Sequence, residues 1–326
     1  MVTLILLVLM ALVFDFLNGL HDSSNIVATM ISSRAMRPRV ALIMTAVAEF
    51  CGPFIFGVAV ATTIGKDLVA PGSVTIQVVL ATLGSAIAWN LITWWLGIPS
   101  SSSHALVGGI LGAVAVGDGT AALLLGGLSK VLLALFLSPI VGLGVGYLLT
   151  KMIFKLARDA SPRINSLFRR GQILTALALA LSHGTNDAQK TMGVITMGLV
   201  ATGALSRFEV PLWVVALSAG AISLGTATGG WRLIRTLGGK FYRIRPVHGF
   251  SAQLASASVI LGAAVLGGPV STTQVVSSAI LGAGSAERVN KVRWGVAGNI
   301  LTAWLLTIPS TAIIAAGTYG LIVGLF

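Results

Sequence analysis

The chain is poor in charged residues and almost free of cysteine. Asp, Glu, Lys and Arg make up only 9% of its 326 residues, whereas 56% are hydrophobic. Soluble domains carry about 25% charged residues, so this composition excludes an ordinary soluble protein. The single cysteine, Cys51, excludes a disulfide within the chain. We therefore expect an all-α polytopic protein of the cell (inner or plasma) membrane, with the lipid bilayer as its surroundings.

Acidic residues are the scarcer of the few charges, with nine against 21 basic residues and a net charge of +12. In a soluble chain this excess would suggest nucleic-acid binding. Here the basic residues cluster between apolar runs, which is typical of cytoplasmic loops, so no nucleic-acid partner is expected. The sequence also lacks a Gly-x-x-x-x-Gly-Lys-Ser/Thr phosphate loop, which argues against ATP-driven chemistry.

Polar residues interrupt the apolar run that extends from Val2 to about Ile31. The run is long enough to cross a hydrocarbon core, which takes about 20 apolar residues. Asp22 would cost at least about 2.5 kcal/mol at that depth, and such a residue is a functional-site candidate by default. The polar residues are spaced three and four apart and so share one face of a helix. They are Asp15, Asn18, Asp22 and Asn25.

A second polar cluster, His183 to Lys190, lies in another apolar run near the midpoint of the chain. Its Asp187 follows Asp22 by 165 residues. The segments at 98–104 and 268–274, rich in serine and threonine, repeat at an offset of 170. A structural hydrogen bond between helices is the simpler alternative, but it does not explain why the cluster occurs twice. Ordered matches at a nearly constant offset indicate a transporter built from repeats, with its binding site between them.

We predict two inverted repeats, residues 1–150 and 171–326, joined by a basic cytoplasmic linker at 151–170. Each repeat is expected to contain one re-entrant hairpin, near 98–117 and 268–285. Irregular backbone at membrane depth is tolerated only where protein or a water-filled cavity surrounds it. Five crossings in each repeat give about ten transmembrane helices.

The count of ten depends on two apolar segments that contain proline. Residues 120–150 are interpreted as two spans that meet near Pro139, because this places the following basic linker inside the cell. The equivalent segment, about 292–326, is interpreted as two spans that meet at Pro309. Both termini are then outside, and the basic residues at 288–293 also fall outside.

The two motifs and the two polar tips together offer carboxylates, amides, hydroxyls and free backbone N–H groups. The N-termini of broken helices suit a tetrahedral oxyanion. Carboxylates repel an anion unless a cation is present, so we expect Asp22 and Asp187 to hold sodium ions or to carry protons. This requirement is a physical basis for symport. A protonated phosphate can donate a hydrogen bond to a carboxylate and sulfate cannot, which favours phosphate.

The predicted site draws on both motifs and both tips. The phosphate-binding residues are Asp22, Asn25, Ser101, Ser102, Ser103, Asn186, Asp187, Lys190, Ser271, Thr272 and Thr273. The sodium ligands are Asp22, Asp187, Asn186, Ser102 and Thr272. Lys190 either contacts the anion or neutralises Asp187. Glu49 is expected to serve the scaffold, because its repeat partner Leu217 is uncharged. No cofactor other than the coupling ions is expected.

At these motifs the sequence resembles the inorganic phosphate transporter (PiT) family. The run Gly184-Thr-Asn186-Asp187 matches the Gly-x-Asn-Asp core of the family, and the first copy has His21 in place of the asparagine. The tips resemble the Pro-Val-Ser-Thr-Thr-His element of the family, with Gln274 in place of the second histidine. The resemblance covers essentially the whole chain. It implies an inverted-repeat fold, secondary active transport of phosphate with sodium or protons, and a homodimer.

Three other functions remain open at this point. The first is a sulfate permease of the same fold. Competition of sulfate against the uptake of labelled phosphate would distinguish it from a phosphate transporter. An anion channel would give large ohmic currents in bilayers. An intramembrane hydrolase could use the serines beside His104, but the second tip has Gln274 in that place. Because a duplicated site suits transport better than a single nucleophile, we do not expect an enzyme.

Overall fold

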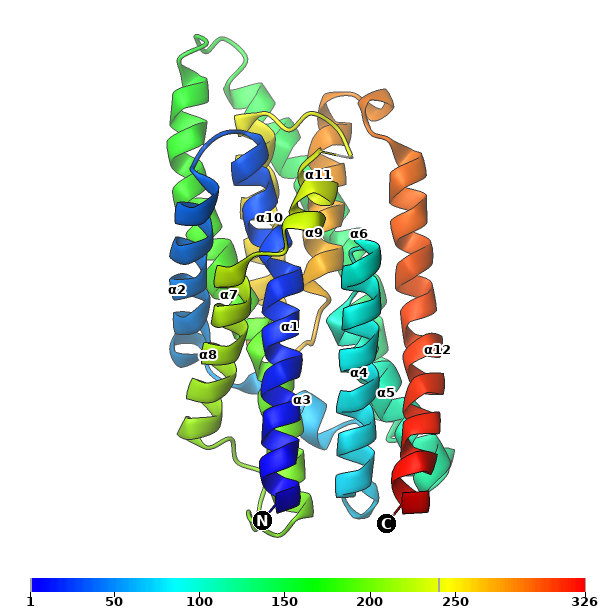
Figure 1. Ribbon diagram of the computed structural model, residues 1–326. Helices are drawn as coiled ribbons and strands as arrows, with labels where there is room; N and C mark the ends of the chain where they lie inside the picture. Colours follow the sequence, from blue (N-terminus) through cyan, green and yellow to red (C-terminus); the bar gives the residue numbers. More distant parts are fainter. Residues whose placement is uncertain (1, 240, 326) are drawn as a thin grey trace.

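The computed structural model describes residues 2–239 and 241–325, and this part of the chain is all-helical, without a β-strand. The helices lie side by side in one bundle (Figure 1). They are α1 Val2–Ser32, α2 Pro38–Phe56, α3 Ala59–Lys66, α4 Ile76–Leu96, α5 Ser102–Gly117, α6 Leu125–Leu156, α7 Ile164–Ala201, α8 Leu212–Thr228, α9 Trp231–Gly239, α10 Pro246–Val265, α11 Thr272–Glu287 and α12 Trp294–Leu325. The all-helical prediction is confirmed.

Several of these helices are long and apolar enough to cross a bilayer. Among the described residues, six pass this test singly: α1, α2, α4, α6, α10 and α12. The pair α8 and α9 passes it together, with a bend of 70° at the break between them. The longest helix, α7, has 38 residues and carries the second polar motif at its centre. The chain is therefore a multi-pass membrane protein, as its composition predicts.

Polar residues separate two hydrophobic clusters within the bundle. The first motif helix, α1, contributes Leu7 and Phe14 to one cluster and Ile26 and Met30 to the other. The polar motif occupies the stretch between Phe14 and Ile26, and most of its side chains are buried. The motif is thus enclosed by protein rather than exposed to lipid, as its charge requires.

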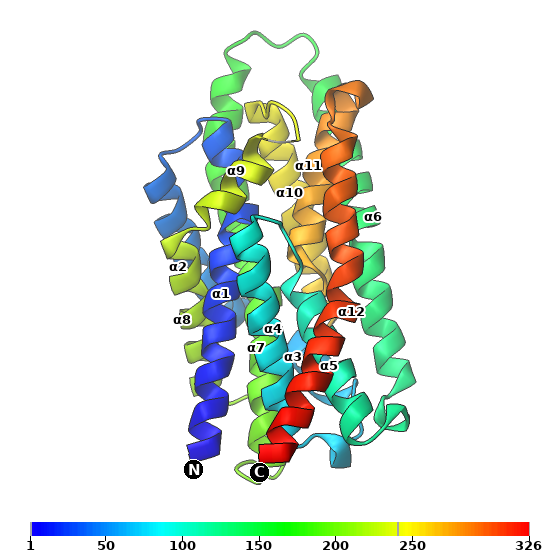
Figure 2. The same cartoon turned by 45° about the vertical axis from the view of Figure 1, so that its right-hand side comes forward.

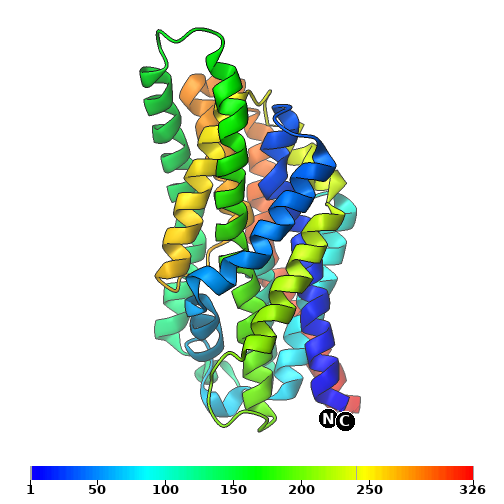
Figure 3. The same ribbon diagram turned by 90° about the vertical axis from the view of Figure 1, so that its left-hand side faces the viewer.

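Two glycines bring the motif helices into backbone contact with their neighbours. A Cβ atom at Gly19 would lie 1.9 Å from the carbonyl oxygen of Ile222 on α8. A Cβ atom at Gly184 would lie 2.1 Å from the carbonyl oxygen of Glu49 on α2. Small residues permit this close approach of helix backbones in membranes. As a result, α1 packs on α8 and α7 packs on α2. The helices α2 and α8 lie next to each other on one face of the bundle (Figure 3).

The two proline-containing segments are single helices, so the prediction of two spans in each is wrong. Both α6 and α12 are continuous over 32 residues. A helix of this length is about 48 Å long, enough for one tilted crossing. Pro139 removes the hydrogen bond to the carbonyl oxygen of Leu135, and the Ser138 hydroxyl donates to that oxygen instead, at 3.0 Å. Such replacement partners allow proline inside membrane helices.

Each polar tip connects two antiparallel helices. The non-helical residues 97–101 join α4 to α5 deep in the bundle (Figure 2), and residues 266–271 join α10 to α11. The segments 98–117 and 268–285 therefore contain a tip and one helix each, and these helices pack against the preceding helices α4 and α10. Both α4 and α10 are long and apolar enough to cross a bilayer by themselves, so the two re-entrant hairpins stay a prediction.

Four loops at one end of the bundle, the upper end in Figure 1, each carry at least two Lys or Arg residues. They connect α1 to α2, α6 to α7, α9 to α10 and α11 to α12, whereas both ends of the chain lie at the opposite end. The basic residues at 288–293 thus share an end with the other basic loops. The prediction that separated them is wrong, because it counted two crossings in the segment that forms α12.

Candidate functional site

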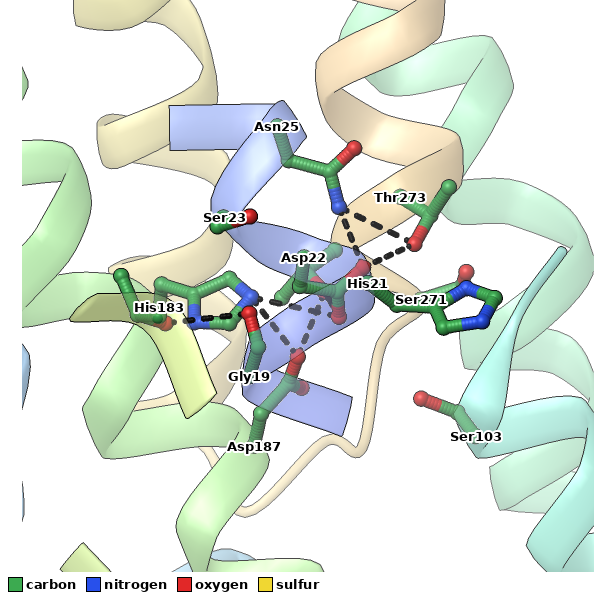
Figure 4. A network of polar contacts seen from close by, with 12 residues as sticks. Gly19, His21, Asp22, Ser23, Asn25, Ser103, His183, Asp187, Ser271 and Thr273 are labelled. Atoms are coloured by element: carbon green, nitrogen blue, oxygen red, sulfur yellow. Dashed lines mark hydrogen bonds and ion pairs between the residues drawn. The ribbon is translucent and has the colours of Figure 1, made fainter. Parts of the chain in front are cut away.

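The two aspartates of the repeated motif lie next to each other. Nε2 of His183 is 3.3 Å from Oδ2 of Asp22 and 3.1 Å from Oδ2 of Asp187. All three side chains are buried, and each offers a ligand atom within 4.8 Å of the others. Figure 4 shows them converging from α1 and α7. Residues 165 positions apart in the sequence therefore form one polar centre.

The start of α11 links both aspartates. The hydroxyl of Thr273 donates to Oδ1 of Asp22 at 2.7 Å, and the hydroxyl of Thr272 donates to Oδ2 of Asp187 at 2.6 Å. The amide of Asn25 donates to the same oxygen of Asp22 at 2.5 Å and to the Thr273 hydroxyl at 3.1 Å. Any movement of this tip would therefore change the ligands of both carboxylates.

Lys190 is the counter-ion of Asp187 in this structure. Its ammonium group donates to Oδ1 of Asp187, to the Ser103 hydroxyl at 2.6 Å and to the carbonyl oxygen of Val270 at 2.9 Å. Ser103 belongs to the first tip and Val270 to the second, so the lysine holds the two tips together. Of the two roles considered for Lys190, the structure displays neutralisation of Asp187.

Four further predicted residues lie at the tips or donate to them and make no hydrogen bond to the aspartates. Ser101 and Ser271 are N-caps: each hydroxyl accepts from the backbone N–H three residues on, at 3.2 and 3.3 Å. Ser102 follows the first cap as the opening residue of α5 and is buried. The amide of Asn186 donates to the carbonyl oxygen of Gly268 at 3.2 Å, and its own oxygen has no partner among the described residues.

The site list from the sequence omitted His183 and Glu49. Nδ1 of His183 lies 2.6 Å from Oε1 of Glu49, and both side chains are fully buried. The spacing of four between His183 and Asp187 was the available signal, because it places both on one helix face. Glu49 had no such signal, since it reaches the site only through the close packing of α2 against Gly184.

The centre of the bundle carries more negative than positive side chains. Its buried carboxylates are Asp15, Asp22, Glu49 and Asp187. Lys190 and His183 are the basic side chains that face them. A buried charge without a partner is strongly unfavourable, so this centre requires cations or protons. Carboxylate, amide and hydroxyl oxygens are the donors that hard cations prefer.

The two polar tips meet at the same centre. The hydroxyl of Ser103, near the start of α5, donates to the carbonyl oxygen of Val270 in the second tip, at 3.2 Å. The N-termini of α5 and α11 are therefore neighbours. Free backbone N–H groups and the positive ends of helix dipoles favour an anion at such a place. Groups suited to binding cations and groups suited to binding an anion thus lie together.

Comparisons with known proteins agree with this chemistry. Residues 18–315 match the model of the phosphate transporter family. A probable low-affinity inorganic phosphate transporter from Bacillus subtilis is 48% identical, over 97% of this chain and 96% of its own. A protein with the same description from Rhizobium meliloti is 45% identical, over 96% and 94% of the two chains.

A solved structure has a similar fold. It is described as the sodium-dependent phosphate transporter and matches with a TM-score of 0.89 and 25% identity, over 100% of both chains. The family and these relatives are transporters and not enzymes, as predicted from the sequence. The match to the family model over most of the chain, with relatives at 45 to 48% identity, also confirms the resemblance seen in the motifs. The chain belongs to the phosphate transporter family.

Proposed function

We propose that this protein imports inorganic phosphate by symport with sodium ions, through alternating access. The observation that carries the proposal is the excess of buried carboxylates around one lysine and one histidine. An anion cannot enter such a centre unless cations enter with it. The similarity to a protein described as a sodium-dependent phosphate transporter supports sodium as the coupling ion, with protons as the alternative.

The proposed roles divide the site between cations and the anion. Sodium ions bind the carboxylates of Asp22 and Asp187, with oxygens from Asn186, Ser102 and Thr272 as further ligands. A sodium ion bound to Asp187 weakens the ion pair between Asp187 and the ammonium group of Lys190. Lysine and asparagine from the motifs, with the tip hydroxyls and backbone N–H groups, can then turn to phosphate. The proposed phosphate-binding residues are Asn25, Ser101, Ser103, Lys190, Ser271 and Thr273, together with the five sodium ligands.

The packing of the helices supports an inverted repeat of residues 1–150 and 171–326, with the linker at 151–170. The contact of α1 with α8 has a counterpart in that of α7 with α2, and the contact of α6 with α11 has one in that of α12 with α5. The members of each equivalent pair run in opposite directions through the bundle (Figure 1). We infer six complete crossings, by α1, α2, α6, α7, α8 and α12, and two hairpins, α4–α5 and α10–α11, which enter from opposite faces.

The positive-inside rule assigns the end with the basic loops to the cytoplasm and both termini to the outside. We expect a membrane-impermeant thiol reagent, applied to intact cells, to label a cysteine at position 206 and to spare cysteines at 161 and 290. The variants are Ser206→Cys, Ser161→Cys and Asn290→Cys, each in a Cys51→Ser background, and all three positions are exposed. Labelling at 290 from outside would contradict the single crossing by α12.

Uptake of labelled phosphate into proteoliposomes tests the coupling. An inward sodium gradient is expected to drive accumulation at least about tenfold above equilibration, because each ion adds its gradient to that of the anion. Liposomes with a proton gradient, and liposomes with neither gradient, are the comparisons. Saturable uptake that responds to neither gradient would contradict symport.

Sulfate permease and anion channel are the competing functions. We expect sulfate to compete with phosphate at least about 100-fold more weakly, because buried carboxylates can accept a proton from HPO4 2− but repel sulfate without compensation. Equal competition would favour the permease. The burial of the motif side chains and the contact between the two tips favour a carrier over an open pore. The homodimer implied by the resemblance stays a prediction.

A further inference from the structure

Asp15 is a buried acid that the proposed site does not use. It lies on α1 almost two turns from Asp22 and has no exposed surface. Neither of its carboxylate oxygens has a hydrogen-bond partner among the described residues. Water would solvate an exposed carboxylate, but an isolated buried one is strongly unfavourable. This position therefore needs either a bound cation or a proton on the carboxylate.

The packing of α1 against α7 identifies the surroundings of Asp15. The side chain of Leu7 faces Gly198, and Asp22 faces His183. The two helices are antiparallel, so the register between these points places Asp15 opposite residues 190 and 191. The hydroxyl of Thr191 lies near enough to interact with the carboxylate, although no hydrogen bond of standard length joins the two side chains.

Two polar side chains near this position offer oxygen atoms that can bind a cation. The hydroxyl oxygen of Thr191 and the amide oxygen of Asn18 are also buried without partners among the described residues. Asn18 lies one turn from Asp15, on the same face of α1. The nearest basic side chain, Lys190, is already bound to Asp187 and to both tips. Four unpartnered oxygen atoms on three side chains thus form a set without a cation.

We propose that Asp15, Asn18 and Thr191 form a further sodium site, next to the central one. The ligands are a carboxylate, an amide oxygen and a hydroxyl, which are hard oxygen donors of the kind that alkali and alkaline-earth cations prefer. This proposal rests on the proposed sodium coupling and adds one ion to it. The ion neutralises a carboxylate that Lys190 does not reach.

The second repeat has no equivalent of this site. At the offset of 165, the counterparts of Asp15 and Thr191 are Ala180 and Ile26, and both are buried apolar residues. The additional site therefore exists on one side of the central aspartates only, toward the end that holds the N-terminus (Figure 1). A sodium ion that arrives from the proposed outside reaches Asp15 before it reaches Asp22.

Binding of labelled sodium to the purified full chain, without phosphate, tests the proposal. We expect Asp15→Asn to lower the number of bound ions by one. Thr191→Val is expected to weaken the affinity of that ion about tenfold, because it removes one ligand. Thr196→Val is the matched control, since the hydroxyl of Thr196 donates to a carbonyl oxygen of its own helix at 2.7 Å and should leave binding unchanged.

The outcomes separate this inference from the proposed function. If Asp15→Asn binds as many sodium ions as the wild type, with unchanged affinity, the additional site is wrong and sodium coupling stands. If Thr191→Val binds sodium like Thr196→Val, the ligand set is wrong, whether or not Asp15→Asn folds. If the wild type binds no sodium, both the additional site and the proposed sodium coupling are wrong.

Discussion

Asp22→Asn and Asp187→Asn are each expected to reduce phosphate uptake at least about 100-fold, because each removes a charge worth several kcal/mol to a bound cation. Both carboxylates accept hydrogen bonds from the second tip, at 2.7 and 2.6 Å, and asparagine preserves the size of the side chain. Uptake into proteoliposomes is the measurement. Asp118→Asn, in an exposed turn between α5 and α6, is the control and should transport like the wild type.

The two aspartates should differ in their effect on stability. Asp187→Asn leaves the ammonium group of Lys190 buried without its counter-ion, which costs about 3–5 kcal/mol. Asp22→Asn strands no lysine and should remain close to the wild type in melting temperature. The double variant Asp187→Asn/Lys190→Gln should recover stability without recovering uptake. Near-normal uptake by both single variants would remove the aspartates from the site.

Gly184→Ala is expected to prevent normal folding or uptake, because its methyl group would overlap the backbone of α2. The Cβ atom would lie 2.1 Å from the carbonyl oxygen of Glu49. The helices must separate to relieve this contact, and overpacking of this kind costs about 1–3 kcal/mol. Separation would also pull Glu49 away from His183. The melting temperature in detergent, together with uptake, measures the effect.

Gly144→Ala supplies the control for this prediction. Gly144 lies on α6, and a Cβ atom there would meet no neighbour within 4 Å. Alanine has a higher helix propensity than glycine by about 1 kcal/mol, so this variant should match or exceed the wild type in stability. A Gly184→Ala protein with the melting temperature and uptake of the Gly144→Ala protein would contradict the proposed tight packing of α7 on α2.

The central pair of the site and several of its partners, such as Asn25 and Lys190, were predictable from the sequence, whereas the contact between His183 and Glu49 was not. The repeat offset alone identified Asp22 and Asp187 as equivalents that should meet. His183 and Glu49 touch because two helices pack through Gly184, and no spacing along the chain encodes that contact. Contacts between distant helices depend on packing, which a single sequence does not reveal.

Helix boundaries were predicted less well than motif positions, for a reason that lies in membrane composition. An apolar segment such as α4 is long enough for a full crossing, so hydropathy cannot distinguish a complete span from one arm of a hairpin. Likewise, Pro139 looks like a break in the sequence. In the structure the hydroxyl of Ser138 takes the place of the lost backbone donor and the helix continues.

The repeat also predicted equivalent positions without predicting their chemistry. Asn25 contacts Asp22 and the second tip, whereas Lys190 occupies the equivalent position and contacts Asp187 and the first tip. One half of the site is thus held by a neutral amide and the other by a charge. We infer that only the Asp187 half must lose a salt bridge when a cation binds.

The most direct test of cation-dependent anion binding is the affinity of the purified protein for labelled phosphate at equilibrium. It should be measured in sodium chloride and in choline chloride, at pH 6 and pH 8. We expect sodium to tighten phosphate binding at least about tenfold, because co-bound cations neutralise the buried carboxylates. Tightening by protons alone would make the proton the coupling ion. Equal affinity under all four conditions would contradict the claim that anion and cation enter this site together.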